Sequence, residues 1–216
     1  MQDSTSKEKI LKKVRKALIH KSTVDSVDID YESEIYLTSE EPLEFTFAEK
    51  FSSVNGKFIF CENQADFIQN LASLIAENKW ESIFCFENTI QDFLTKAQIR
   101  FSNDPASIKS VDIGITLCEA LIARTGSVLI TSKQASGRRL PLYANIHIVV
   151  AYTSQLVYNI KEGLKMISTK YADQIPSMIA NITGPSRTAD IEKTLVQGAH
   201  GPKEIFVMLI DDSLEK

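Results

Sequence analysis

The chain has 216 residues, of which 44% are hydrophobic and 24% are charged, and its formal net charge is −4. This composition is typical of a globular protein with a sizeable core, and the acidic balance argues against general nucleic-acid binding. No apolar run is long enough to suggest a membrane span, and the N-terminus is polar, unlike a signal peptide. We therefore expect a cytoplasmic protein.

The N-terminal quarter is predicted to be a helix followed by a linker. Residues 5–20 form an amphipathic pattern, with lysines on one face and Ile10, Leu11, Val14 and Leu18 on the other. The stretch from Ser22 to Glu49 is rich in acidic and hydroxyl residues and predicts a linker with one short extended segment near Ile35–Leu37. The basic helix could dock on a partner or on a second copy of the chain, forming a homo-oligomer, although a solvated arm is the more common outcome.

From Gly56 onward, short apolar runs alternate with amphipathic segments. The runs predict strands over Lys57–Cys61 and Ser82–Phe86, and the amphipathic segments predict helices over Gln64–Asn78 and Asn88–Ala97. This alternation is typical of a parallel sheet that helices cover on both faces. We therefore divide the chain into a helix and linker over residues 1–50 and an α/β domain over residues 51–216.

The next hundred residues continue the alternation. The predicted elements are a strand from Val111 to Ile115, a helical turn over Leu117–Ala123, a turn at Thr125–Gly126, a strand over Val128–Thr131, a polar loop over Gln134–Arg139, a strand over Ile146–Ala151, and a helix over Gln155–Ile167 with Leu156, Ile160, Leu164 and Ile167 facing inward. Together with the later strands, this predicts an α/β fold with a mostly parallel sheet of about seven strands.

The chain is organised around residues 182–202, ITGPSRTADIEKTLVQGAHGP. We predict a strand over Met178–Ile182, a turn at Gly184–Pro185, a helix from Ser186 that ends at Gly198, a turn at His200–Pro202, and a closing strand over Ile205–Ile210. The N–H groups at a helix N-terminus suit an anion, and Arg187 would add a forked charged donor.

A simpler interpretation of this segment is that Ser186 or Thr188 caps the helix and that Gly–Pro only turns the chain. Asp190 and Glu192 already complement the helix dipole and would repel an anion unless Arg187 offsets them. One of these two carboxylates could instead be functional itself. The pattern alone leaves the choice open.

Four further groups carry chemistry. Glu119 is a candidate general base, although an isolated acidic residue is more often solvated or in a salt bridge. Arg138 and Arg139, next to Gly137, could grip an anionic substrate, although two loop arginines often only form a soluble surface. His147 opens an apolar strand and is predicted to be a satisfied structural histidine, whereas His200 is a candidate ligand contact.

The remaining patterns exclude several classes of protein. Cys61, Cys85 and Cys118 form no CxxC pair, so neither a disulfide framework nor an iron–sulfur site is expected, and a structural zinc is improbable. We expect Cys61 and Cys85 to be core residues. The sequence contains no GxGxxG, GxxxxGK[ST], GxSxG or HExxH motif, which argues against a standard nucleotide-binding or hydrolase assignment.

These motifs carry a resemblance to a known family. GPSRTADIE with its flanks resembles the C-terminal signature of the LUD domain, the family that includes lactate utilization protein C. GITLCEALIARTGSVLIT and GRRLPLYANIHIVV resemble two further signatures of that family, so the resemblance covers roughly residues 55–212. Arg124 stands where the family usually has an acidic residue, and Tyr143–Asn145 replaces a proline-containing segment.

The resemblance implies an α/β fold similar to ribose-phosphate isomerases, coenzyme A transferases and methenyltetrahydrofolate synthetase. It also implies a role beside two iron–sulfur partner proteins in the oxidation of L-lactate to pyruvate, with the clusters in the partners and no cofactor bound by this chain. The acid or base, if there is one, would be Glu119 or Asp190. The predicted ligand-binding residues for a carboxylate or phosphate are Thr125, Gly126, Gly137, Arg138, Gly184, Ser186, Arg187, Thr188 and His200.

Two alternative functions remain. The chain could be a self-sufficient enzyme for a phosphorylated or folate-like ligand, as the fold relatives are. It could also be a non-catalytic assembly module that binds its partners through the N-terminal helix. Whether the chain catalyses any step is left open by the sequence.

Overall fold

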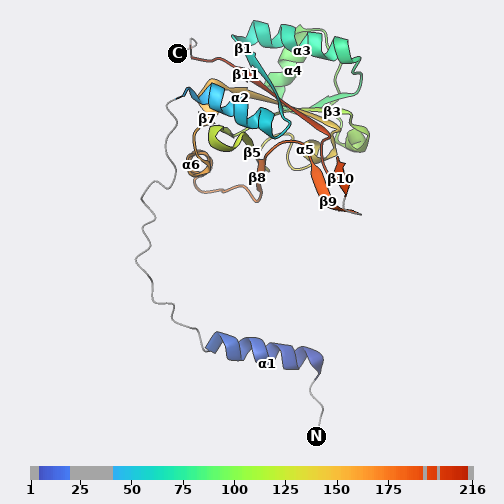
Figure 1. Cartoon of the computed structure of the whole chain (residues 1–216). Coiled ribbons are helices and arrows are strands. Elements are labelled where there is room, and N and C mark those ends of the chain that lie inside the picture. The colour runs from blue at the N-terminus through green and yellow to red at the C-terminus, as the bar shows by residue number, and fades with distance from the viewer. Residues whose placement is uncertain (1–4, 20–40, 192–193, 199, 214–216) are drawn as a thin grey trace. The chain divides into compact units, whose positions relative to one another are not determined.

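The computed structural model describes residues 5–19, 41–191, 194–198 and 200–213 (Figure 1). The chain divides into two units, Met1–Leu37 and Thr38–Lys216. The first unit contains helix α1 (Ser6–Ile19), which confirms the predicted amphipathic helix, and Ile10 and Leu18 on it are each 62% exposed. The extended segment predicted at Ile35–Leu37 lies outside the described residues.

The second unit is built on a five-stranded sheet in which every pairing is parallel. The strand order is β1-β11-β6-β3-β2, with bounds Lys57–Cys61 (β1), Glu204–Ile210 (β11), Ile146–Tyr152 (β6), Ile113–Leu117 (β3) and Ile83–Cys85 (β2). The sequence of β11, EIFVMLI, is almost entirely apolar because both faces of this central strand are covered. The prediction of an α/β fold with a mostly parallel sheet is confirmed.

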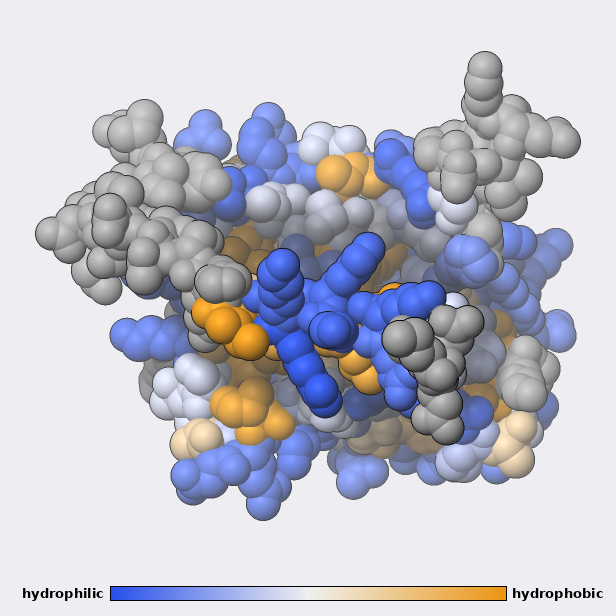
Figure 2. Space-filling model, turned by 90° about the horizontal axis from the view of Figure 1, so that it is seen from below, coloured by the Kyte–Doolittle hydropathy of each residue, from blue (hydrophilic) through white to orange (hydrophobic). Residues whose placement is uncertain are grey.

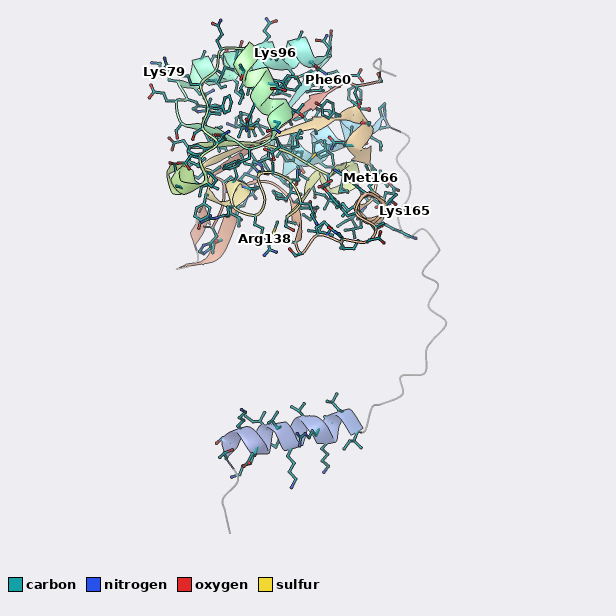
Figure 3. All side chains as sticks on the ribbon, turned by 180° about the vertical axis from the view of Figure 1, so that it is seen from behind. Phe60, Lys79, Lys96, Arg138, Lys165 and Met166 are labelled. Atoms are coloured by element: carbon teal, nitrogen blue, oxygen red, sulfur yellow. The ribbon has the colours of Figure 1, made fainter. Side chains whose placement is uncertain are left out.

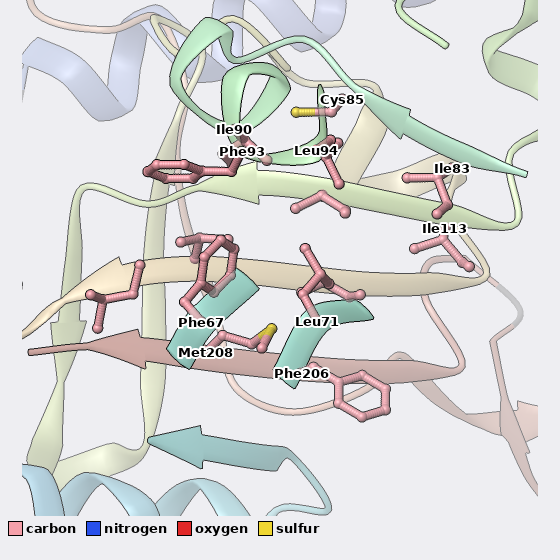
Figure 4. Packing of buried hydrophobic residues seen from close by; sticks show 14 of the residues in the cluster. Phe67, Leu71, Ile83, Cys85, Ile90, Phe93, Leu94, Ile113, Phe206 and Met208 are labelled. Carbon is pink, nitrogen blue, oxygen red and sulfur yellow. The ribbon is translucent and has the colours of Figure 1, made fainter. Parts of the chain in front are cut away.

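Helices α3 (Gln64–Asn78) and α4 (Asn88–Lys96) cover one face of this sheet (Figure 1). Figure 4 shows Phe67 and Leu71 of α3, together with Ile90 and Phe93 of α4, packed over the strands. Burying each of these large side chains contributes roughly 1.5–3 kcal/mol to the stability of the fold. The side chain of Asn63 caps the N-terminus of α3, because its Oδ1 accepts from the backbone N–H groups of Ala65 and Asp66.

The other face of the central sheet is covered by a second, four-stranded sheet and by helix α2 (Leu43–Ser53). The second sheet has the order β7-β4-β5-β8, with bounds Leu156–Val157 (β7), Ala120–Ile122 (β4), Ser127–Thr131 (β5) and Ile179–Ile182 (β8). The remaining elements are helices α5 (Leu140–Tyr143) and α6 (Ile160–Lys170), the antiparallel hairpin of β9 (Arg187–Ile191) and β10 (Thr194–Gln197), and the 3₁₀ turns Pro105–Ser110, Ala123–Thr125 and Thr153–Gln155. The prediction of one sheet of about seven strands is therefore wrong, because the strands divide between two stacked sheets.

The predicted linker is wrong at its C-terminal end, where the chain forms α2. Phe47 and Phe51 lie one helical turn apart, are fully buried, and stack with their ring centroids 5.3 Å apart. Only a narrow stripe of this helix is buried, and many of its other residues are acidic or carry hydroxyl groups. The segment therefore resembles a linker in sequence.

Two other local predictions are also wrong. The helical turn predicted over Leu117–Ala123 is the short strand β4, whose residues Ala120–Ile122 are all buried. The helix predicted from Gln155 begins only at Ile160, because Leu156 belongs to β7. Of the residues expected to face inward, Leu156 and Ile167 are buried, whereas Ile160 and Leu164 are exposed.

The helix predicted between Ser186 and Gly198 is the β9–β10 hairpin. Thr188 pairs with Val196, and Gln197 pairs with Arg187. The β-branched residues of this segment favour a strand, and Gly198 closes the hairpin with φ of +77° while its N–H donates to Ser186 O at 2.9 Å. Since there is no helix N-terminus here, the backbone argument for an anion site at this turn does not hold.

In the view of Figure 2, hydrophobic residues are visible in small separate groups among hydrophilic ones. Among the described helices, none combines the length and the apolar character that a membrane span needs.

Candidate functional site

Four of the predicted ligand-binding residues line one cavity beside the β9–β10 hairpin, which we call the hairpin cavity. It has a volume of about 280 Å³ and lies near the amino end of β11, and the four residues are Arg138, Gly184, Ser186 and His200. Most of its wall is apolar, with Ile130, Pro141 and Met178 among the lining residues. Figure 3 shows Arg138 on the side of the domain that carries the hairpin, away from α3 and α4.

The polar groups of the hairpin cavity differ in whether the fold already uses them in hydrogen bonds. The N–H of Ser186 donates to Pro202 O at 2.9 Å, so it is occupied by the fold. The Arg138 guanidinium is exposed and donates through Nη2 to the hydroxyl of Ser177. His200 is exposed, as its sequence context predicts. Because a guanidinium has five donors, Arg138 keeps donors for an anion at the cavity.

Arg187 and Gly184 hold helix α2. The Arg187 Nη2 donates to Val54 O at 2.7 Å, at the C-terminal end of α2. Gly184 has φ of +78°, and a Cβ added there would lie 2.4 Å from the same carbonyl oxygen. Arg187 is not among the residues that line the hairpin cavity, so its predicted role as an anion ligand has no support in this geometry.

Thr125 and Gly126 also lie outside the hairpin cavity. Gly126 has φ of +59°, and a Cβ on it would lie 2.3 Å from Phe51 N, so a glycine is needed for α2 to pack this closely. The Ser127 hydroxyl bonds Thr125 Oγ1 and Thr183 Oγ1, each at 2.8 Å. The Thr–Gly pair therefore shapes the turn against α2, which is a structural role.

Gly137, Thr188 and Asp190 are further predicted site residues, and none of them is among the described residues that line the hairpin cavity. Gly137 has φ of +57° and open space around it, so it shapes the loop before Arg138. Thr188 and Asp190 belong to β9, and the side chain of Asp190 lies outside the described part of the structure. Arg124 donates through Nε to Asn159 Oδ1 at 2.7 Å, next to the start of α6.

Glu119 lies at the opposite end of the central sheet, directly after β3, and its carboxylate is buried. Oε1 accepts from Thr131 Oγ1 and from the Tyr171 hydroxyl, both at 2.8 Å, and Oε2 accepts from Lys170 Nζ at 2.8 Å. Burial alone would raise the pKa of Glu119, but the hydrogen bonds from Lys170, Thr131 and Tyr171 outweigh burial and lower the pKa below its ordinary value. A carboxylate held in this way stays ionised and is a weak proton acceptor.

Lys170 and Tyr171 respond to Glu119 in turn. Burial lowers the pKa of Lys170, but the hydrogen bond and charge of Glu119 raise it overall. Burial and the hydrogen bond to Glu119 raise the pKa of Tyr171. The sequence gives no local signal for this cluster, because both residues lie about fifty positions after Glu119 and join it only through the packing of α6 on the second sheet.

The histidine and cysteine predictions are partly confirmed. His147 is fully buried, and its Nε2 bonds Thr116 Oγ1 at 2.8 Å, but its Nδ1 has no partner among the described residues, so it is only half satisfied. Burial lowers the pKa of His147 to about 4. Cys61 and Cys85 are core residues as predicted, and the described residues contain no cluster of His, Cys, Asp and Glu suited to a metal ion.

The chain was compared with known proteins. It is 30% identical over 140 residues to "Lactate utilization protein C" of Shouchella clausii, which covers 62% of this chain and 61% of that protein. It is 35% identical over 106 residues to the protein of the same name in Bacillus licheniformis, covering 48% of this chain and 44% of the relative. The chain thus matches less than two thirds of the length of these relatives.

A solved DUF162-family protein from Deinococcus radiodurans shares the fold, with a TM-score of 0.57, 17% sequence identity, and coverage of 81% of this chain and 99% of that one. The family model of the LUD domain matches residues 46–210, so the match begins inside α2 and ends with β11. This match takes in the hairpin cavity and Gly126, Gly184 and Arg187, which contact α2 or Val54 at its C-terminal end, and the chain belongs to the LUD-domain family.

Proposed function

We propose that this chain is a component of lactate utilization that acts with iron–sulfur partner proteins in the oxidation of L-lactate to pyruvate. The proposal is supported by the LUD-domain match over residues 46–210 and by relatives that are named for lactate utilization. The redox centres would belong to the partners, since the three cysteines of this chain are dispersed in the sequence.

The contribution of this chain would be to bind an anionic small molecule in the hairpin cavity. The observation that carries this proposal is the convergence of Arg138, Ser186 and His200 on one cavity whose remaining wall is mostly apolar. A guanidinium at the rim of an apolar cavity suits an anion that carries an apolar body. Ligands that carry a phosphate or a carboxylate meet that description.

A thermal-shift screen tests the binding proposal. The purified chain is screened against lactate, pyruvate, phosphosugars, nucleotides, coenzyme A and folates, and a ligand at a hundredfold its Kd stabilises by roughly 2.7 kcal/mol. Arg138→Gln should weaken a hit about ten- to a hundredfold, because it removes one charged hydrogen-bond partner. Arg139→Gln is the matched control, since Arg139 is its exposed neighbour but does not line the cavity.

The two arginine variants make the outcome decisive. An equal loss of affinity in both variants would point to a diffuse charge effect and contradict a site at the hairpin cavity. Turnover of a phosphosugar or a folate by the purified chain would instead favour the self-sufficient enzyme. Absence of any hit with the lone chain would refute binding by this chain alone.

A pull-down tests the role with partners. The tagged chain, purified from cells grown on L-lactate, should carry proteins with the absorption of iron–sulfur clusters, and deletion of its gene should abolish growth on L-lactate but not on glucose. Ile10→Asp with Leu18→Asp should release those proteins if the exposed apolar face of α1 binds them. Lys9→Asp with Lys16→Asp changes the polar face of the same helix and serves as the comparison.

A further inference from the structure

A second cavity lies at the carboxyl ends of the parallel strands, and we call it the carboxyl-end cavity. It has a volume of about 260 Å³, and its wall comes from residues at or just after the carboxyl ends of β2, β3 and β6, including Glu87, Glu119 and Tyr152. It shares no lining residue with the hairpin cavity. In open parallel sheets this end is where ligands bind, because the strand-end loops leave a crevice there.

Glu87 carries the first part of the argument, because its carboxylate is buried with only weak partners. The residue is 5% exposed, its Oε1 accepts from Ser136 N at 3.2 Å, and its Oε2 lies 3.8 Å from the thiol of Cys85. Within the described residues no cation forms an ion pair with it. Buried carboxylates are normally paired with a cation or several strong donors, so Oε2 has capacity for one more donor.

Lys133 provides the complementary charge. It lines the same cavity, and its Nζ donates to the neutral Gln174 Oε1 at 3.1 Å. Among the described carboxylates none forms an ion pair with Lys133, whereas Lys170 is already held by Glu119. The wall of the cavity therefore includes a lysine and a buried carboxylate that each lack a partner of opposite charge in the described structure.

The wall around these two groups is fixed by two glutamines that brace the ends of the strands. Gln134 Nε2 donates to Leu117 O at 2.6 Å, and Gln155 Nε2 donates to Cys118 O at 2.7 Å. Their Oε1 atoms accept from backbone N–H groups of β5 and β6, each at 2.8 Å. A cavity with a rigid wall spends little free energy on ordering when a ligand enters.

We propose that the carboxyl-end cavity binds a small organic acid that carries a hydroxyl or ammonium group beside its carboxylate. The ligand carboxylate pairs with Lys133, and the neighbouring hydroxyl or ammonium donates to Glu87. Glu119 is a positioning residue that holds Lys170 and Tyr171 in the wall. A volume of about 260 Å³ is small beside cavities that hold drug-sized ligands, so three-carbon acids are suitable probes.

The experiment compares three acids of equal carbon number by NMR titration of the full chain. L-lactate and L-alanine carry the donor, whereas propionate lacks it and is otherwise the same acid. We expect at least one donor-bearing acid to bind about tenfold or more tightly than propionate, because a hydrogen bond to a charged group is at stake. The amide resonance of Ser136 is the local reporter, since it donates to Glu87.

Variants place the binding within the cavity. Lys133→Met should weaken the acid about tenfold, and Lys96→Met is the control because Lys96 is also an exposed lysine but does not line the cavity. Glu87→Leu should remove the preference over propionate. Arg138→Gln should leave this titration unchanged, which separates the two cavities.

Several outcomes would overturn the proposal. Equal affinity for propionate, no shift of Ser136 with any of the acids, or unchanged affinity in Lys133→Met would each do so. The comparison of ligands uses the unmodified chain, so it remains decisive even if Glu87→Leu does not fold. A hit in the hairpin-cavity screen without binding here would leave the proposed function intact.

Discussion

Substitution of Gly126 by alanine should destabilise the domain by displacing helix α2. The new Cβ would lie 2.3 Å from Phe51 N and 2.5 Å from the carbonyl carbon of Lys50, both backbone atoms that cannot rotate away. The left-handed conformation, with φ of +59°, costs alanine about 1–2 kcal/mol, and forcing the helix outward costs about 1–3 kcal/mol more. We therefore expect a total loss of about 2–5 kcal/mol.

Gly137 supplies the matched control for this prediction. Its φ of +57° is nearly the same, but nothing lies within 4 Å of the Cβ position. Gly137→Ala should cost only the conformational term of about 1–2 kcal/mol. Urea unfolding followed by circular dichroism measures both free energies, and each kcal/mol corresponds to about 2–4 °C in Tm at this size.

The difference between the two variants isolates the packing of α2. Equal losses in Gly126→Ala and Gly137→Ala would show that α2 yields without cost, and the reasoning about its close docking would then be refuted. A larger loss in Gly126→Ala, accompanied by faster proteolysis near Phe51, is the result we expect, because the helix would detach before the sheets unfold.

Three further predictions concern buried or bonded polar groups. The folded-state pKa of Glu119 is depressed, so its stabilising effect is present above the ordinary value of 4.5 and is lost as pH falls through the folded pKa. The difference in unfolding free energy between wild type and Glu119→Gln should therefore be about 1.5–3 kcal/mol near neutral pH and should shrink in acid. A difference that does not change with pH would contradict this. The folded-state pKa of His147 is about 4, so between about pH 6.5 and pH 4 unfolding takes up a proton and the stability of the fold declines as pH falls. In an NMR titration the ring resonances of His147 should not shift between about pH 7 and 5. A titration midpoint near about 6.5 would show that the ring is hydrated. Arg187→Ala should lower the free energy of unfolding in urea by about 0.5–1.5 kcal/mol, because Val54 O loses its hydrogen bond from Arg187, and ligand affinity at the hairpin cavity should not change. Lower ligand affinity at unchanged stability would instead show that Arg187 binds the ligand.

The part of the fold that the sequence predicts well is the part set by local patterns. The run KFIFC gives β1, and the 3.6-residue spacing of Phe67 and Leu71 gives α3, because one uninterrupted apolar pattern decides each element. Helix α2 escapes such reasoning, since Phe47 and Phe51 are almost its whole buried stripe. Their burial depends on a glycine seventy-five residues away at Gly126, which no local window includes.

The same division applies to the candidate site. Arg138, Ser186 and His200 could be selected from sequence because each lies in a polar turn between apolar runs, and the structure places them on one cavity. The pairing of Glu119 with Lys170 could not be selected, because it depends on how α6 packs. The sequence of the hairpin resembles that of a helix, because ADIEKTLVQ contains many helix-forming residues at helical spacing. The strand conformation depends instead on the pairing between β9 and β10, which a local window of sequence does not show.

The position of β11 has a consequence for how the chain folds during synthesis. This strand lies between β1 and β6, so the residues that complete the centre of the sheet leave the ribosome about 150 residues after β1 does. Until then β1 and β6 have no partner between them, and their apolar residues remain open to aggregation or to chaperones. Strands β2, β3 and β6 can pair earlier, but β1 can join the sheet only after the segment that follows the hairpin has emerged.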